Sequence, residues 1–192
     1  VRLRDEGMIV KTLPEIRLDF NAIAKGYAID RLAVMLDALG ISNYLVEVGG
    51  ELRARGENRA KEQPWVVGID DPQAEKGRAI KKIISLKDHS MASSGNYRKF
   101  RVDSITGEKY VHTIDPHTGF TRNSNVLATS VLAEMCMEAD GYATALMAMD
   151  LEDSKKLLSE SNELEGYIIY LDEAGETREY TTPGFEALVQ ER

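Results

Sequence analysis

Three segments of this 192-residue sequence hold side chains suited to catalysis or to binding a ligand. Residues 19–30 read DFNAIAKGYAID, residues 112–119 read HTIDPHTG, and residues 140–144 read DGYAT. They supply a lysine beside a glycine, a histidine ahead of a Pro…Gly turn, and a carboxylate four positions before a hydroxyl. Because cationic side chains and glycine-flanked backbone recognise phosphate, and oxygen donors hold Mg²⁺, the segments together predict a phosphate-and-metal site.

Asp140 and Thr144 provide the metal part of this hypothesis. An apolar helix predicted over 135–149 places them at i and i+4, so their oxygens face the same way. A carboxylate with a hydroxyl suits Mg²⁺, which completes its octahedron with water and substrate phosphate. Taken alone, a capping role for Asp140 and back-bonding of Thr144 to its own helix is the simpler interpretation. The apolar neighbours of Asp140 favour the metal, because an unpaired buried carboxylate is costly.

Two glycine-containing steps could bring backbone close to a phosphate. Lys25-Gly26 is expected at a strand-to-helix junction, where unpaired N–H groups and the helix dipole favour anions. A plain helix start with a solvent-facing lysine accounts for this pair equally well. Gly49-Gly50 follows a predicted strand, and a β-bulge or kink is favoured over backbone exposed to a ligand.

A hydroxyl-rich segment and a histidine complete the set. Ser93-Ser94-Gly95 is interpreted as a loop that could donate to phosphate oxygens, although most such loops are only turns. His112 ends a predicted strand and is the histidine placed for acid–base work beside a turn. A buried structural role for His112 is the alternative.

Apolar periodicity predicts mixed α and β structure in one unit, residues 1–192. Helices are expected over 25–39, 135–149 and 151–161, and strands over 43–48, 51–55, 65–69, 80–86, 97–102, 109–114, 125–132, 166–171 and 176–180. A net charge of −8 argues against nucleic acid as a partner. The single cysteine, Cys136, cannot form an internal disulfide.

The order of five motifs is similar to that of the ApbE family. These motifs are DFNAIAKGYAID at 19–30, VGGE at 48–51, SSGNY at 93–97, HTIDPHTG at 112–119 and ADGYATA at 139–145. The resemblance implies an α+β fold of ApbE type (T-fold-like), with mixed sheet and helix layers. It also implies Mg²⁺-dependent transfer of FMN from FAD to a threonine hydroxyl of a target flavoprotein, such as an Nqr- or Rnf-type subunit. An FAD pyrophosphatase and a non-catalytic flavin-binding module are the alternatives.

The resemblance assigns roles to individual residues. Metal ligands would be the Asp140 carboxylate, the Thr144 hydroxyl and the main-chain oxygen of Ala24, and catalytic roles would fall to His112 and Asp140. The flavin contacts that it implies are Lys25, Gly49, Gly50, Ser93, Ser94, Gly95, His112 and Ile114.

This sequence departs from the family pattern in three respects. Glu47 stands where Asn is frequent, and His117 stands where Arg or Lys is common. Family members also carry a substantial N-terminal segment ahead of the motif at 19–30. We therefore expect that the chain lacks an N-terminal part of the fold, binds FAD weakly or not at all, and self-associates through apolar surface exposed by that loss. The family further implies an exported protein, often lipid-anchored, at the outer face of the cytoplasmic membrane or in the periplasm.

Overall fold

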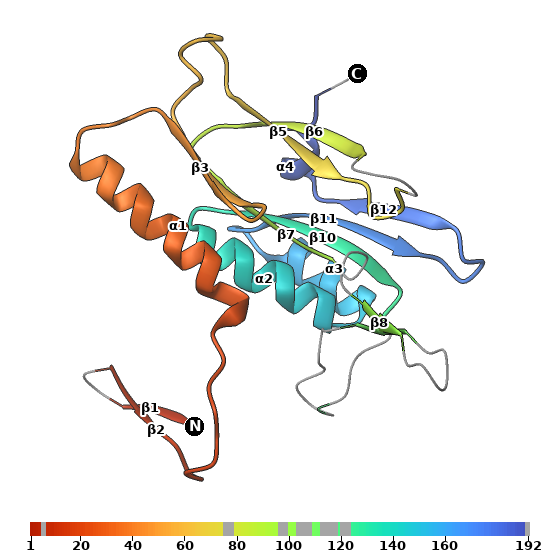
Figure 1. Cartoon of the computed structure of the whole chain (residues 1–192). Helices are drawn as coiled ribbons and strands as arrows, with labels where there is room; N and C mark the ends of the chain where they lie inside the picture. Colours follow the sequence, from red (N-terminus) through yellow and green to blue (C-terminus); the bar gives the residue numbers. More distant parts are fainter. Residues whose placement is uncertain are drawn as a thin grey trace.

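The computed structural model of the chain describes residues 1–4, 7–74, 79–95, 100–102, 109–111, 119 and 124–190. Its centre is a six-stranded antiparallel sheet with the order β12-β11-β10-β7-β4-β3 (Figure 1). The strands are β3 (Tyr44–Val48), β4 (Glu51–Arg55), β7 (Ser90–Gly95), β10 (Val126–Ala133), β11 (Glu165–Leu171) and β12 (Thr177–Thr181). Strand β10 is central and covered on both sides, which explains its nearly continuous apolar sequence.

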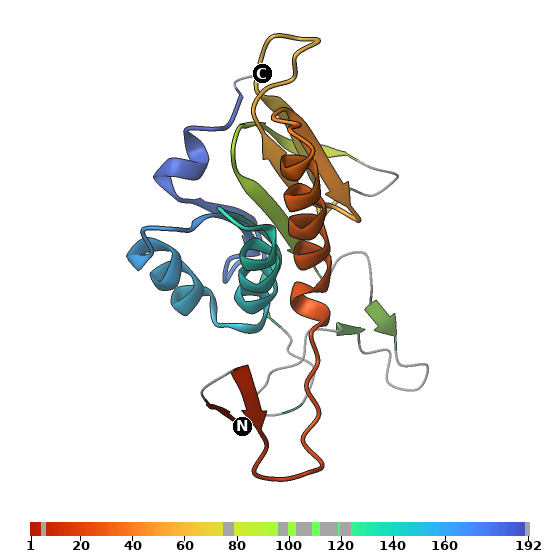
Figure 2. The ribbon, with the colours of Figure 1, turned by 90° about the vertical axis from the view of Figure 1, so that its left-hand side faces the viewer.

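Helices cover one face of this sheet. Helix α1 (Asn21–Ala38) packs along α2 (Cys136–Ala148), and α3 (Leu151–Glu160) lies on the same side (Figures 1 and 2). Small residues let α2 approach the sheet closely, because Ala139 and Ala143 are fully buried against β7 and β10. The side chains of Leu146, Leu158 and Ile168 fill the same core layer.

The opposite face of the sheet is covered by a separate hairpin and a short helix. Strands β5 (Trp65–Asp70) and β6 (Ile80–Leu86) pair antiparallel, and α4 (Pro183–Glu186) lies beside them (Figure 1). Their core contains Ile84 and Phe185, which are completely buried and pack with Tyr167 of β11. Two core layers therefore enclose the sheet, which is the α+β architecture expected from the sequence.

Two further hairpins lie at the periphery. Strands β1 (Arg2–Arg4) and β2 (Met8–Val10) form an arm that projects away from the sheet (Figures 1 and 2). Strands β8 (Phe100–Val102) and β9 (Lys109–Val111) pair antiparallel, which confirms the hairpin expected in this region. In the described part of the chain, no helix combines the length and the apolar character needed to cross a membrane.

The structure corrects three local expectations. Helix α1 begins at Asn21, four residues before the predicted start, so Lys25-Gly26 lies inside the helix. No strand leads directly into it, because residues 11–20 are not in a strand. Gly49-Gly50 is the two-residue turn of the β3–β4 hairpin, with φ of +65° and +109°, and is neither a bulge nor a kink. Both φ values lie in the region that favours glycine.

The third correction concerns Ser93-Ser94-Gly95. These residues end strand β7, paired with β10, and are not a loop. Small polar residues have little intrinsic preference for strands, so the neighbouring strands decide the conformation here. The consequence is that the two serine side chains point to opposite faces of the sheet.

Candidate functional site

A close approach of α1 and α2 builds the centre of the site. A Cβ atom placed on Gly26 would lie 2.3 Å from the carbonyl oxygen of Cys136 and 2.6 Å from Cα of Met137. Real Cβ atoms are not found so close to backbone, so only glycine fits at this position. The contact brings the backbone of α1 within hydrogen-bonding reach of side chains on α2.

Asp140 of α2 lies at this close contact between the helices. It lies in the interior of α2, where it cannot cap the helix, and only 3% of its surface is exposed. Its Oδ2 accepts a hydrogen bond from the Gly26 N–H at 3.0 Å. Burial raises the pKa of Asp140, while the Gly26 N–H and the positive charge of Lys25 oppose that rise. Burial is the larger effect, so the pKa of Asp140 lies above its ordinary value although nearby positive charge favours the ionised form.

Thr144 lies one helical turn beyond Asp140 and meets the sheet. Its Oγ1 lies 3.4 Å from Oγ of Ser94 on β7, a long hydrogen bond between two hydroxyls. Ser93 is directed elsewhere, since its Oγ bonds Oγ of Ser130 at 2.8 Å. Of the two serines expected in the site, the structure brings Ser94 to the Asp140–Thr144 face of α2.

Lys25 and Glu51 form an ion pair beside Asp140. Nζ of Lys25 bonds Oε1 of Glu51, whose side chain is only 3% exposed whereas that of Lys25 is 47% exposed. Burial raises the pKa of Glu51, Lys25 opposes this, and the nearby Asp140 charge raises it further. The turn at Gly49 packs over the pair, because a Cβ built there would lie 3.7 Å from Cδ of Lys25. These contacts bring together the lysine and the glycine pair that were proposed from the sequence as site residues.

Two more ion pairs continue this contact along α1 and β4. Arg53 Nη1 lies 2.7 Å from Oδ1 of Asp30, and Arg55 pairs with Asp37. The Asp30 carboxylate also accepts the backbone N–H groups at the start of α2, from Cys136 at 3.0 Å and from the next residue at 2.9 Å. Asp30 therefore ties α1, α2 and β4 together next to the site.

The remaining predicted site residues either neighbour the site along the chain or lie outside the described residues. Ala24 is an exposed residue of α1 immediately before Lys25, and Gly95 ends β7 after Ser94. His112 and Ile114 lie outside the described residues, as does His117. Glu51 was not predicted as a site residue, although it stands in the VGGE motif. The sequence feature that could have indicated it is a carboxylate directly after two glycines.

The oxygen donors near Gly26 fit a hard cation. Among the described residues, no group of three or more His, Cys, Asp and Glu side chains is arranged to hold a metal. A metal here would instead take one buried carboxylate, a hydroxyl, main-chain oxygen and water. Mg²⁺ accepts such a set, since it uses few protein carboxylates and keeps several waters.

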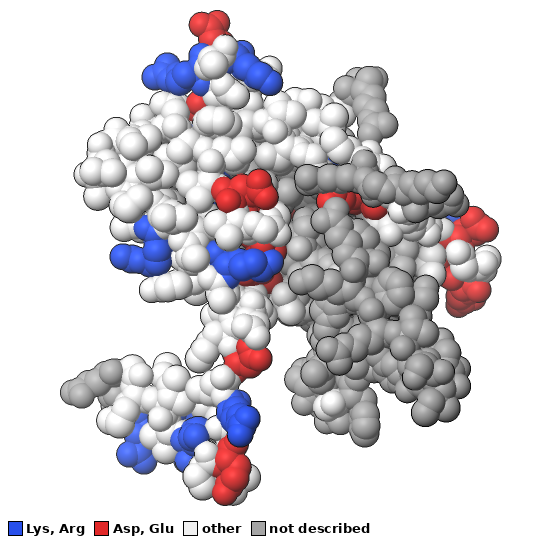
Figure 3. All heavy atoms as spheres, in the orientation of Figure 1, with Lys and Arg blue, Asp and Glu red and all other residues white. Residues whose placement is uncertain are grey.

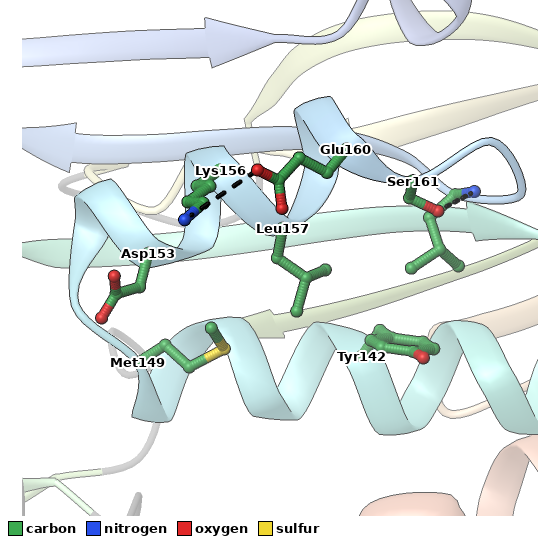
Figure 4. A pocket seen from close by; sticks show the side chains of 8 residues that line it. Tyr142, Met149, Asp153, Lys156, Leu157, Glu160 and Ser161 are labelled. Carbon is green, nitrogen blue, oxygen red and sulfur yellow. Dashed lines mark hydrogen bonds and ion pairs between the residues drawn. The ribbon is translucent and has the colours of Figure 1, made fainter.

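A groove between α2 and α3 is a separate feature. Tyr142 of α2 and Met149, which directly follows α2, lie across the groove from Leu157 of α3 (Figure 4). Tyr142 is two residues from Asp140, which on an α-helix turns the two side chains to different sides. The groove is therefore not part of the site formed by Lys25, Glu51 and Asp140.

Comparison with known proteins decides the family. The ApbE family matches residues 1–168 of the chain. The chain belongs to the ApbE family. Within it, the chain is 36% identical over 172 residues to a protein of Haemophilus influenzae and 38% identical over 176 residues to one of Vibrio cholerae, each named FAD:protein FMN transferase. These alignments cover 90% and 92% of the chain, and 49% and 51% of the two relatives.

Solved ApbE structures share the fold. The flavin transferase ApbE from Vibrio cholerae superposes with a TM-score of 0.78 at 36% identity, covering 93% of this chain and 54% of that one. The ApbE protein from Thermotoga maritima gives a TM-score of 0.80 at 28% identity, covering 99% and 59%. The chain thus spans about half the length of the curated ApbE relatives it matches.

Proposed function

We propose that the protein is a Mg²⁺-dependent FAD:protein FMN transferase. The observation that carries the proposal is the buried Asp140 beside the Lys25–Glu51 pair, in a chain of the ApbE family. The names of the relatives in Haemophilus influenzae and Vibrio cholerae support the reaction class. The acceptor is a flavoprotein with a target threonine, of the Nqr or Rnf type.

The reaction exchanges one phosphoester linkage for another. The threonine hydroxyl of the acceptor attacks the phosphorus of the FMN half of FAD, and the P–O bond to the AMP half breaks. AMP leaves with the bonding electron pair, and the hydroxyl proton passes to a base, a role that we assign to His112. Such reactions depend mainly on positioning and on neutralising the phosphate charge.

Different residues of this chain would position the ligand and neutralise the phosphate charge. The Lys25 ammonium, which is half-exposed, meets the phosphate charge, and the Gly49-Gly50 turn lets the ligand approach backbone. Asp140, Thr144 and the main-chain oxygen of Ala24 would hold Mg²⁺. When bound, Mg²⁺ would neutralise negative charge on the pyrophosphate. The other flavin contacts that we propose are Ser94, Gly95, His112 and Ile114, and Ser93 through its main chain, since its side chain is directed toward Ser130.

A labelling experiment tests the proposal. The protein is incubated with FAD, Mg²⁺ and an Nqr-type acceptor domain, and flavin fluorescence on the acceptor is followed on a denaturing gel. We expect covalent label with wild type and none with Asp140→Ala. Asp153→Ala removes an exposed carboxylate on α3 and is the matched control, which should label normally.

Each other outcome has a distinct meaning. Release of FMN and AMP without label on a competent acceptor would favour an FAD pyrophosphatase. Tight FAD binding that is unchanged by chelator, with FAD intact after days, would favour a flavin-binding module. Turnover by Asp140→Ala that still depends on Mg²⁺ would show that the metal site is misplaced.

Two further proposals concern the surroundings of the protein. We propose that it acts outside the cytoplasm, at the outer face of the membrane or in the periplasm, where fractionation of cells would locate it. We also propose self-association through the outer side of α1, where Val34, Met35 and Leu39 are at least half exposed. In Figure 3, which has the orientation of Figure 1, the surface over the C-terminal end of α1 carries no charged side chains, which supports this proposal. A monomeric mass in light scattering at high concentration would contradict it.

A further inference from the structure

The Lys25–Glu51 pair differs from its two neighbours in the row of ion pairs between α1 and β4. In the pairs Asp30–Arg53 and Asp37–Arg55 the helix carries the carboxylate and the strand carries the cation. At Lys25–Glu51 the polarity is reversed, so the helix presents the cation. The reversed pair is the one that lies beside Asp140.

Glu51 is also buried to a degree that its pairing does not explain. It is the least exposed of the six charged side chains in this row, at 3%. Its Oε1 holds Lys25, but its Oε2 is buried and has no hydrogen-bond partner among the described residues. An unpaired oxygen of a buried carboxylate is costly, which a purely structural ion pair would avoid.

We propose that Glu51 is a positioning residue for nucleotide binding, which rests on the proposed function. Its Oε1 fixes the Lys25 ammonium at the edge of the site, where the phosphate groups of FAD bind. Its Oε2, held under the Gly49 turn, accepts a hydrogen bond from a donor that arrives with the nucleotide, either a ligand hydroxyl or amide or a water that the ligand orders. The unpaired oxygen is then satisfied only in the complex.

Charge and positioning predict opposite effects for Glu51→Gln. If only charge mattered, removing a carboxylate next to an anion site would strengthen binding of the anionic ligand. Positioning predicts weaker binding, because the neutral amide holds an ammonium less firmly and presents a donor in place of one acceptor. We expect the Kd for FAD to rise at least fivefold in Glu51→Gln, measured by quenching of flavin fluorescence.

A double-mutant cycle shows whether Glu51 acts through Lys25. Lys25→Met should weaken FAD binding, and adding Glu51→Gln to it should give less than the product of the two separate losses. Arg55→Gln breaks the third pair of the same row and is the matched control, with an expected Kd within twofold of wild type. Titrations in Mg²⁺ and in chelator separate this role from metal binding, since the loss in Glu51→Gln should persist in chelator.

The outcomes separate this inference from the function on which it rests. Absence of FAD binding by the folded full-length protein would overturn the proposed function. Tight binding by wild type with an unchanged or lower Kd in Glu51→Gln would overturn the positioning role alone. The positioning role would also be overturned if the double variant lost affinity for FAD by the full product of the two single losses. A loss in Glu51→Gln that disappears in chelator would overturn it as well. Circular dichroism and melting curves of each variant confirm that it is folded.

Discussion

The contact between Gly26 and α2 makes a quantitative prediction for Gly26→Ala. The new Cβ would start 2.3 Å from a backbone oxygen, about 1 Å short of the 3.4 Å at which ordinary van der Waals contact begins. The three atoms nearest to it all belong to the backbone of α2, so no rotation of a side chain relieves these contacts. The two helices must move apart, and the hydrogen bond from Gly26 to Asp140 is strained or lost.

The expected cost follows from three opposing effects. Overpacking of a tight contact costs about 1–3 kcal/mol. Loss of a hydrogen bond to a buried carboxylate adds roughly 1.5–3 kcal/mol. The better helix propensity of alanine returns about 1 kcal/mol. We expect a net loss of about 2–4 kcal/mol, which for a chain of this length lowers Tm by roughly 5–15 °C.

Urea unfolding followed by circular dichroism measures this loss, and Gly141→Ala is the matched control. Gly141 lies in α2, where a Cβ would meet Cγ2 of Ile23 at 3.1 Å. That atom is a side-chain methyl at a distance that a shift of a few tenths of an ångström relieves, so the control should stay within about 1 kcal/mol of wild type. Equal stability of Gly26→Ala and Gly141→Ala would refute the close backbone approach of the helices.

Three other predictions concern single positions. Gly50→Ala should lower the free energy of unfolding in urea by about 1–3 kcal/mol, because φ of +109° strains any other residue. Gly49→Asn should lower it less, because asparagine tolerates φ of +65°, and the reverse order would contradict the turn geometry. Cys136 should not react with a disulfide reagent at pH 8 until denaturant is added, since burial raises the pKa of its thiol to about 12 and leaves almost no thiolate; rapid native labelling would contradict this. Asp30→Ala should lower the free energy of unfolding by about 2–4 kcal/mol, since it removes the acceptor for two N–H groups of α2 and the partner of Arg53. A change under about 0.5 kcal/mol in the same urea assay would contradict the role of Asp30 in joining α1, α2 and β4.

The sequence predicts most of the elements because their periodicity is strong. The helix expected over 135–149 is α2 at Cys136–Ala148, and the final hairpin lies within one residue of its predicted strands. Asp140 and Thr144 could be placed on one helix face from their spacing alone. The start of α1 could not be placed, because Phe20 precedes it and no side chain caps it, so the usual sequence signal is absent.

The roles of Glu51 and Ser94 depend on contacts between distant elements. Glu51 lies 26 positions from Lys25, and nothing local indicates that β4 would pass beneath that part of α1. Ser94 belongs to the site only because β7 runs as an inner strand under α2. Such placements follow from strand order, which a pattern of hydrophobic residues does not specify.

The order of positive and negative side chains in the ion pairs between α1 and β4 favours one position of α1 along the strand. From Lys25 to Asp30 the helix rises about 7.5 Å, and from Glu51 to Arg53 the strand advances about 6.7 Å, so the first two pairs stay in step. A slip of α1 by one pair would set Lys25 against Arg53 or Asp30 against Glu51. Both are like charges in a partly buried contact, which is unfavourable. The reversal at Glu51 therefore favours a single register of α1, and that register is the one in which Gly26 meets Asp140.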